Sequence, residues 1–365
     1  MQEMFAVVHD TRHPGHTKHK LCDILTITMC AVMCGQDELW SIYAYAQNKA
    51  ELFRERFGIK SIPSKATFSR VLASIDGKEV ADLVINHMKQ LLGEGGDIIA
   101  VDGKAIRSTS KEGVPHSAIQ ILTAYLTESG VVLGQEKIYQ KTNEIPTFQE
   151  TLSYLNVAGK TVTADAMHCQ RETCKKVIKK HGNYVFGLKE NQKTLYDDVA
   201  LYFEDKDLQN EMEIYTTIEK NKGRIEQRVC RKASNIDWLI RNHSWPGLKT
   251  VFAVDRTITK SKGTTKETSY YISSSDDSAD RLLSIARNHW GIESMHWMLD
   301  VVFSEDDCIL ESEDAHVALN AFRKYALAMH RNYITQRQIK QSKRSHMIKC
   351  LMNDNLMLQI LTASG

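Results

Sequence analysis

Two aspartates in the 365-residue chain stand in the same local setting. Asp102 follows the apolar run Ile98–Val101, and Asp165 follows Val162-Thr163-Ala164. Carboxylates at the ends of adjacent buried strands project into one crevice, where their repulsion is costly unless a cation lies between them. An aspartate that only caps a turn is the ordinary alternative, so the matching pair supports a cation site better than either residue alone.

A third acidic candidate lies on a segment, residues 279–299, whose apolar residues recur at helical spacing. Polar groups at i, i+4, i+7 and i+11 form one face of such a helix. Four ionisable groups beside two tryptophans favour a functional face over one that merely meets solvent. The four polar positions are His289, Glu293, His296 and Asp300.

Oxygen ligands of this kind suit a hard divalent ion such as Mg²⁺. Two ions about 3.5–4 Å apart, bridged by a carboxylate, would activate an attacking oxygen and stabilise the leaving one in phosphodiester chemistry. A zinc or iron centre is the alternative, because Glu293-x-x-His296 resembles the di-metal motif of helical bundles. That motif needs a second copy, which the sequence lacks. We therefore expect two Mg²⁺ ions, with Mn²⁺ able to replace them.

Residues 1–92 are predicted to be helical from their apolar spacing. The breaker-rich stretch 58–64 separates two of these helices, and Ser64 is the expected N-cap of the second. Two helices joined by a short turn fit a helix-turn-helix, with Lys65 and Arg70 on its exposed face. Many helical hairpins bind no DNA, and that interpretation also stands.

Beyond Gly93–Gly96 the pattern changes to short β-runs. Three adjacent strands followed by alternating helix and strand favour an α/β protein with a mixed sheet flanked by helices. We expect strands at 98–101, 119–126, 131–138, 161–164 and 184–188, with one helix opened by Pro146 and another at 170–181.

Residues 191–279 are polar and rich in strand-forming runs, and they predict a β-rich insertion before the helix at 279–299. Farther along, no acidic residue stands between Asp314 and Asp354. Such a stretch usually forms a solvated face, and a phosphate-contacting surface is the second interpretation. Its basic residues are Arg323, Lys324, Arg331, Arg337, Lys340, Lys343, Arg344 and Lys349.

Composition places the chain among soluble globular proteins, with 42% hydrophobic and 25% charged residues. Its length predicts two or three structural units. The eight cysteines form no C-x-x-C pair and mostly have apolar neighbours, which predicts reduced thiols in a cytoplasmic protein. No signal peptide and no run of roughly 20 apolar residues is evident, so we expect no membrane partner.

Three blocks resemble the signature blocks of bacterial DDE insertion-sequence transposases, in particular the H-repeat-associated type. They are Asp-Gly-Lys at 102–104, Thr-Ala-Asp-Ala-Met at 163–167 and His-Trp-Gly-Ile-Glu at 289–293. Supporting segments occur in the expected order at 143–146, 186–192, 223–226 and 299–301. Together they extend over most of the chain.

The resemblance implies a ribonuclease-H-like catalytic core with a helical N-terminal domain and an insertion. Asp102 would lie on the first strand, Asp165 after the fourth and Glu293 on a late helix, and these three would be the catalytic metal ligands. The implied division is an N-terminal DNA-binding domain at 1–92, a core at 97–190 and 280–335, an insertion at 191–279, and a basic tail at 336–365.

One departure from the family pattern concerns its last block, Tyr-x2-Arg-x3-Glu-x6-Lys. In this chain Ala286, His289 and Asp300 occupy the Tyr, Arg and Lys positions. Asp300 is therefore expected to support a metal or a metal ligand rather than to contact phosphate. His289 retains the ability to donate a hydrogen bond to a phosphate.

The resemblance predicts a transposase, that is, an endonuclease and strand-transfer enzyme acting on double-stranded DNA. It would bind the terminal inverted repeats of its element, expose a 3′-hydroxyl and join it to target DNA, as a homodimer on DNA. Expected DNA contacts are Lys65, Arg70, Lys104, Lys189, Arg224, His289, Lys340, Lys343 and Arg344. Expected supporting residues are Asn143, Glu144, His296 and Asp300.

Three alternatives remain open from the sequence. The first is a metal-dependent nuclease without strand transfer. The second is a domesticated DNA-binding regulator, against which the intact set of three carboxylates argues. The third is a non-catalytic interaction protein, which would leave the polar face at 289–300 unexplained.

Overall fold

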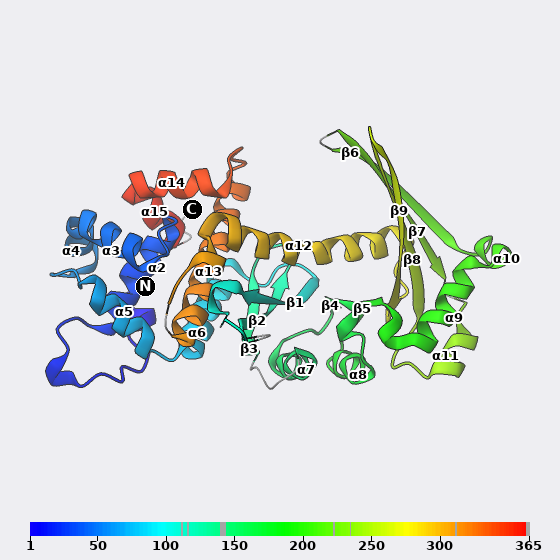
Figure 1. Cartoon of the computed structure of the whole chain (residues 1–365), viewed down its shortest axis with the longest axis horizontal. Coiled ribbons are helices and arrows are strands. Elements are labelled where there is room, and N and C mark those ends of the chain that lie inside the picture. The colour runs from blue at the N-terminus through cyan, green and yellow to red at the C-terminus, as the bar shows by residue number, and fades with distance from the viewer. Residues whose placement is uncertain are drawn as a thin grey trace. The chain divides into compact units, whose positions relative to one another are not determined.

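The computed structural model describes residues 1–110, 112–114, 117–138, 144–221, 223–233, 235–310 and 312–362. The chain divides into two compact units, whose helices and strands are labelled in Figure 1. Unit 1 comprises Met1–Gly95, Gly103–Asn143 and Ser294–Gly365, and unit 2 comprises Gly96–Asp102 and Glu144–Glu293. Among the described residues, no helix combines the length and apolarity that crossing a bilayer requires.

The N-terminal part of unit 1 is helical, as its apolar spacing predicts. Ser64 is the N-cap of α5, and its hydroxyl accepts a hydrogen bond from the Thr67 amide at 3.2 Å. Gly58, at φ +67°, ends the preceding helix in the left-handed conformation that glycine adopts most readily. The helices are α1 (Gln2–Phe5), α2 (Leu21–Met33), α3 (Leu39–Asn48), α4 (Ala50–Phe57), α5 (Lys65–Ser74) and α6 (Gly77–Leu92), with the 3₁₀ helix η1 (Pro14–His16) after α1.

The rest of unit 1 is built around the long helix α13 (Glu313–Gln336), whose residues 315–330 are all buried. It packs against α2, α5 and α6 and against strand β3. The other elements of this part are β2 (Ile119–Leu126), β3 (Val132–Ile138), η2 (Arg107–Thr109), η5 (Glu305–Asp307), α14 (Lys343–Met352) and α15 (Asp354–Leu361).

The phosphate-contacting interpretation of the basic stretch is wrong for three of its residues. Arg323 and Lys324 are 0% and 2% exposed. Arg323 pairs with buried carboxylates, Lys324 donates to Thr123 Oγ1 at 2.7 Å, and Arg331 donates to Tyr125 Oη at 2.9 Å. Because α13 is covered on most sides, cations on it must find partners inside the unit.

Lys324 gives the folded chain a testable dependence on pH. Burial lowers the pKa of Lys324 to about 7, against 10.5 for an ordinary lysine. Between these pH values the unfolded chain holds a proton that the folded chain lacks, so stability rises with pH by up to about 1.4 kcal/mol per pH unit. We expect the urea midpoint to increase from about pH 7.5 to 9 in the wild type and to increase less in Lys324→Met. Equal increases in the two proteins would contradict this assignment.

The described residues contain nine strands in the order β3-β2-β1-β4-β5-β9-β8-β7-β6. β1 pairs with β4 and β4 with β5 in parallel. The pairs β5–β9, β9–β8, β8–β7 and β7–β6 are antiparallel. The expected α/β class with a mixed sheet and helices is confirmed. The strands of unit 2 are β1 (Ile98–Ile106, which continues into unit 1), β4 (Thr161–Ala164), β5 (Asn183–Leu188), β6 (Glu213–Asn221), β7 (Arg224–Ala233), β8 (Thr250–Lys260) and β9 (Gly263–Ser273).

The helices of unit 2 differ from expectation in two places. α7 begins at Glu144, before Pro146, because proline is tolerated in the first turn of a helix. The segment 191–279 contains the four strands β6 to β9, as the β-rich prediction requires, but also three helices that were not predicted. The repeat of Leu195, Val199 and Tyr202 on α9 was a readable helical signal. The helices are α7 (Glu144–Tyr154), α8 (Arg171–Lys179), α9 (Lys193–Glu204), α10 (Lys206–Gln209), α11 (Asp237–His243) and α12 (Ala279–Phe303, which continues into unit 1), with the 3₁₀ helices η3 (Ala166–His168) and η4 (Glu190–Gln192).

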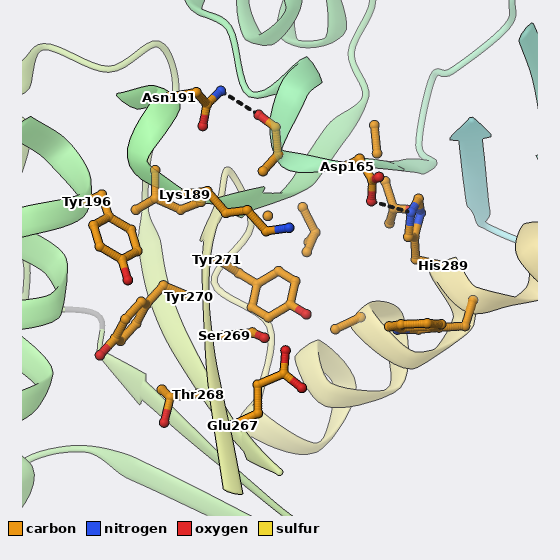
Figure 2. Close-up of a pocket in the computed structure, with 18 of the residues that line it drawn as sticks. Asp165, Lys189, Asn191, Tyr196, Glu267, Thr268, Ser269, Tyr270, Tyr271 and His289 are labelled. Atoms are coloured by element: carbon orange, nitrogen blue, oxygen red, sulfur yellow. Dashed lines mark hydrogen bonds and ion pairs between the residues drawn. The ribbon is translucent and has the colours of Figure 1, made fainter. Parts of the chain in front are cut away.

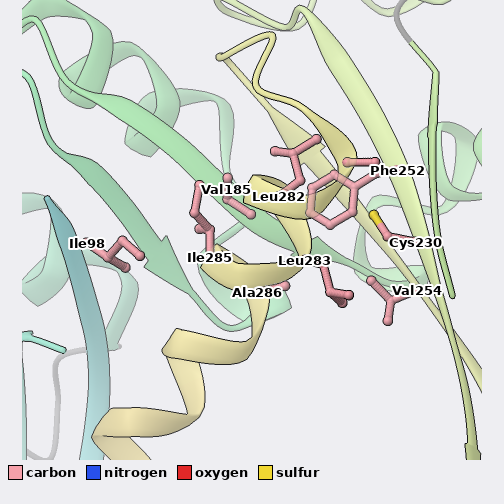
Figure 3. Close-up of a cluster of buried hydrophobic side chains, with 10 residues drawn as sticks. Ile98, Val185, Cys230, Phe252, Val254, Leu282, Leu283, Ile285 and Ala286 are labelled. Atoms are coloured by element: carbon pink, nitrogen blue, oxygen red, sulfur yellow. The ribbon is translucent and has the colours of Figure 1, made fainter. Parts of the chain in front are cut away.

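The first turns of α12 are anchored on the sheet of unit 2 by an apolar cluster (Figure 3). Leu282 and Ile285 on the helix are fully buried, as is Phe252 on β8. Burying side chains of this size contributes about 1.5–3 kcal/mol each. This cluster fixes the rotation of α12 about its axis and therefore the direction of the polar residues one and two turns farther on.

Candidate active site

Asp102 and Asp165 lie next to each other because two parallel strands are in register. Val101 of β1 pairs with Ala164 of β4, and each aspartate is the next residue. One detail of the prediction is wrong: β1 runs on to Ile106, so Asp102 lies within the strand instead of ending it. Asp165 does follow the last residue of β4. Side chains at paired positions of adjacent strands share one side of the sheet, as the two-carboxylate hypothesis requires.

His289 of α12 faces Asp165. Its Nε2 lies 3.5 Å from Asp165 Oδ1, and its Nδ1 lies 3.1 Å from the Thr163 hydroxyl. A neutral ring that donates from Nε2 to the carboxylate leaves Nδ1 to accept from Thr163. The hydrogen bond from His289 lowers the pKa of Asp165, and the charge of Lys189 lowers it further. His289 thus holds Asp165 ionised and oriented.

Glu293 lies one helical turn beyond His289 on α12, within electrostatic range of both aspartates. Partial burial raises the pKa of Glu293, and the negative charges of Asp102 and Asp165 raise it further, while His289 acts in the opposite direction. Mutual repulsion of this kind is relieved when a cation lies among the carboxylates. Three carboxylates from separate elements are therefore gathered in one place.

A cavity of about 680 Å³ in unit 2 contains Asp165, His289 and Glu293. Figure 2 shows Asp165 facing His289, with Lys189 reaching toward the same space from the end of β5. Strand β9 contributes Tyr270 and Tyr271 to the wall. The cavity thus combines acidic groups, one exposed cation and aromatic surface, a mixture suited to a phosphodiester and its neighbouring base or sugar.

The carboxylates of Asp102, Asp165 and Glu293 fit a pair of divalent cations. All are oxygen donors, the class that Mg²⁺ and Mn²⁺ prefer. Asp165 and Glu293 are exposed, which leaves room for ions and substrate. His289 offers nitrogen, but both of its ring nitrogens already have partners. The donor set therefore favours hard cations over a histidine-ligated zinc or iron centre.

Lys104 does not have the role that was predicted for it. It is 11% exposed, and its Nζ lies 2.7 Å from Asp300, 3.1 Å from Glu305 and 3.3 Å from Asp306. A lysine surrounded by three carboxylates is held inside unit 1 and is a poor phosphate ligand. Asp300, the acid at the family's lysine position, thus serves as an ion-pair partner of Lys104.

The remaining predicted residues occupy separate places. In unit 2, Glu144 lies 2.9 Å from Nε2 of the buried His168, and Arg224 lies 3.6 Å from Glu226. His296 is buried in unit 1, and Asn143 lies outside the described residues. Lys343 is half-buried. Four of the predicted DNA contacts are exposed on unit 1, namely Lys65, Arg70, Lys340 and Arg344.

Sequence reasoning missed the aromatic wall of the cavity and the pair formed by Glu144 and His168. Tyr271 is more than a hundred residues from Asp102 in the chain, and β9 reaches the cavity only because it pairs with β5. No local motif marks that pairing. His168, three residues after Asp165, was the one readable signal, since a histidine next to a candidate ligand often orients it.

Comparisons with known proteins match nearly the whole chain. The family model "Transposase DDE domain" matches residues 93–329, and the model "DDE_Tnp_1-associated" matches residues 2–88. The chain is 32% identical to the "H repeat-associated putative transposase YhhI" of Escherichia coli K12, over 100% of this chain and 98% of that protein. It is 33% identical to the "Putative transposase YncI" of Escherichia coli O157:H7, over 90% and 87%.

A solved structure described as the piggyBac transposase synaptic complex with hairpin DNA is also similar, with a TM-score of 0.48 and 11% identity. That likeness covers 99% of this chain and 78% of the other.

Proposed function

The chain belongs to the transposase DDE family, and we propose that it cuts and rejoins DNA with two Mg²⁺ ions held by Asp102, Asp165 and Glu293. The proposal rests on the strand register that puts Asp102 beside Asp165, on the cavity that Asp165 and Glu293 share, and on the effect of both aspartate charges on Glu293. The DDE domain makes the protein an enzyme of the transposase type. The metal identity and the strand-transfer step belong to the proposal.

Each residue of the site has a distinct part in this chemistry. When bound, two divalent cations supply Lewis-acid stabilisation to the attacking and leaving oxygens of a phosphodiester. The three carboxylates hold the cations, and His289 keeps Asp165 oriented. Lys189 offers a cation to a phosphate oxygen. Water first breaks a phosphodiester bond and leaves a 3′-hydroxyl, which then attacks a phosphodiester of target DNA and displaces a second 3′-hydroxyl.

Unit 1 offers a surface that could hold the ends of the element. A cavity of about 700 Å³ there is lined by Arg12, Lys18 and Arg70 together with His13 and His19. Cations clustered in this way gain affinity for phosphates by releasing counterions. Lys65 is exposed at the start of α5, and Lys340 and Arg344 lie exposed near α14. We propose that these residues bind terminal inverted repeats, with two chains pairing two ends in the cytoplasm.

The test is a strand-transfer assay with duplex oligonucleotides that carry the element's ends. With Mg²⁺ we expect nicking at the end and joining of the exposed 3′-hydroxyl to a target duplex. Chelation by EDTA is expected to abolish both steps, and Mn²⁺ to restore them. Cleavage that continues at full rate in EDTA would overturn the metal mechanism. Nicking without joining would replace the proposal with a metal-dependent nuclease.

A further inference from the structure

A second cluster of metal-binding side chains lies in unit 1, away from the carboxylate site in sequence and in chemistry. It consists of His330 on α13 with His346 and Cys350 on α14, all buried. One ligand atom from each residue lies within 4.8 Å of the other two. The family resemblance and the proposed function assign no role to these residues.

The hydrogen bonds of His330 leave one ring nitrogen available as a ligand. Its Nε2 donates to the Met33 carbonyl at 2.8 Å, so Nδ1 carries the lone pair. That Nδ1 accepts a hydrogen bond from His346 Nδ1 at 2.9 Å, so a bound ion would take the place of the His346 proton. Metal-bound histidines commonly donate their second N–H to a backbone carbonyl, which fixes the ring and its tautomer. His330 already has this arrangement.

His346 and Cys350 are four residues apart on α14, so they project from the same face of the helix. Their face meets α13, the helix that carries His330. A hydrogen-bonded histidine pair in an apolar core would account for the two rings. It would not account for the Cys350 thiol, whose sulfur lies within 4.8 Å of a nitrogen of each ring. The position of this thiol is the feature that favours a metal.

We propose that His330, His346 and Cys350 bind a transition-metal ion of the zinc class, which fastens α14 to α13. Two nitrogens and one sulfur form a donor set that selects zinc over magnesium. Bond lengths of about 2.0–2.1 Å to nitrogen place two tetrahedral nitrogens roughly 3.4 Å apart, so the two rings separate by a few tenths of an ångström on binding. The fourth ligand is a solvent oxygen or a further donor.

Bound zinc would hold α14 against α13 in unit 1. Helix α14 is short, and short helices depend on tertiary contacts for their stability. An ion that binds only the folded chain raises its stability in proportion to the logarithm of the ion concentration. The melting temperature is therefore expected to rise with added Zn²⁺.

The experiment measures the zinc content of the purified full-length chain after a brief chelator wash. The parent carries Asp165→Asn so that the carboxylate site does not retain zinc. We expect about one zinc per chain. When Cys350→Ala or His346→Asn is added to that parent, the zinc content is expected to fall to background. The control, Cys230→Ala, removes an equally buried thiol of unit 2 and is expected to keep the ion.

A second measurement protects the test against variants that fail to fold. Cobalt substituted into the parent is expected to give the near-ultraviolet sulfur-to-cobalt absorption of a thiolate ligand, and circular dichroism reports whether each variant is folded. Background zinc in the parent, or a parent without the sulfur-to-cobalt absorption, would overturn the proposal. So would a folded Cys350→Ala chain that retains the ion. These outcomes leave the carboxylate mechanism untouched, because cleavage is assayed separately.

Discussion

Replacing Asp165 with asparagine is expected to lower the rate of DNA cleavage by about 10³-fold or more. Losing a carboxylate that holds the cations removes several kcal/mol of transition-state stabilisation, and each 1.36 kcal/mol is a factor of ten in rate. Asn keeps the size of the side chain, so folding and DNA binding are expected to be preserved. The measurement is single-turnover cleavage of an end-bearing duplex, with DNA binding followed separately.

Asp102→Asn and Glu293→Gln are expected to give losses of the same order, since the three carboxylates act as one set. Asp197→Asn is the matched control. Asp197 is an exposed acid on α9 that pairs with Lys193. Its loss is expected to change the rate by less than about threefold, because exposed ion pairs contribute little. If the Asp165→Asn variant cleaves DNA at the wild-type rate, Asp165 is not part of the catalytic site.

Arg323→Met is expected to destabilise the folded chain by about 3–5 kcal/mol. Arg323 is fully buried and donates to Asp37 at 2.7 Å and to Glu305 at 3.1 Å. Removing the guanidinium leaves two carboxylates inside unit 1 with much of their counter-charge gone. A typical protein has only about 5–15 kcal/mol of stability in total, so the soluble yield is expected to fall as well. Urea denaturation measures the loss.

The matched control for this prediction is Arg344→Met, which removes an exposed arginine of α14. The urea midpoint of Arg344→Met is expected to stay close to that of the wild type. If both variants unfold at the same urea concentration, the buried ion pairs do not stabilise the fold.

The same ion pairs set the response of the chain to acid. Burial raises the pKa of Glu305, but Arg323 and Lys104 outweigh it and bring the value to about 2. The folded pKa is thus below the unfolded one of about 4.3, so this group stabilises the fold above that pH and the stabilisation is lost as the pH falls toward 2.

The local parts of this fold were predictable from the sequence. The strands at 119–126 and 161–164 lie where short β-forming runs were predicted, and Ser64 caps its helix as predicted. Each depends on a few adjacent residues, whose preferences are visible in the chain. The proposed catalytic aspartates were found in the same way, since each follows a short apolar run.

Features that depend on distant partners were not predictable. The charges of Arg323 and Lys324 suggested an exposed basic surface, yet both are buried, because Asp37 and Thr123 come from distant parts of the chain. Lys104 belongs to the Asp-Gly-Lys block and was predicted to contact phosphate, but its ammonium group pairs with Asp300 and Glu305. A single sequence contains the charges of such residues but not their pairings.

The pairing of β9 with β5 bears on how the cavity can change shape. Residues 185–188 pair with 270–273, so strands β6 to β9 continue the sheet of β1, β4 and β5 by backbone hydrogen bonds. A segment tethered only by loops could swing as a lid, whereas a continuous β-ladder resists shear. We therefore expect Tyr271 to keep its position relative to Asp165 as substrates enter and leave. The wall formed by β9 would then select substrates by its fixed shape. Different DNA sequences would be accommodated by rotation of its side chains.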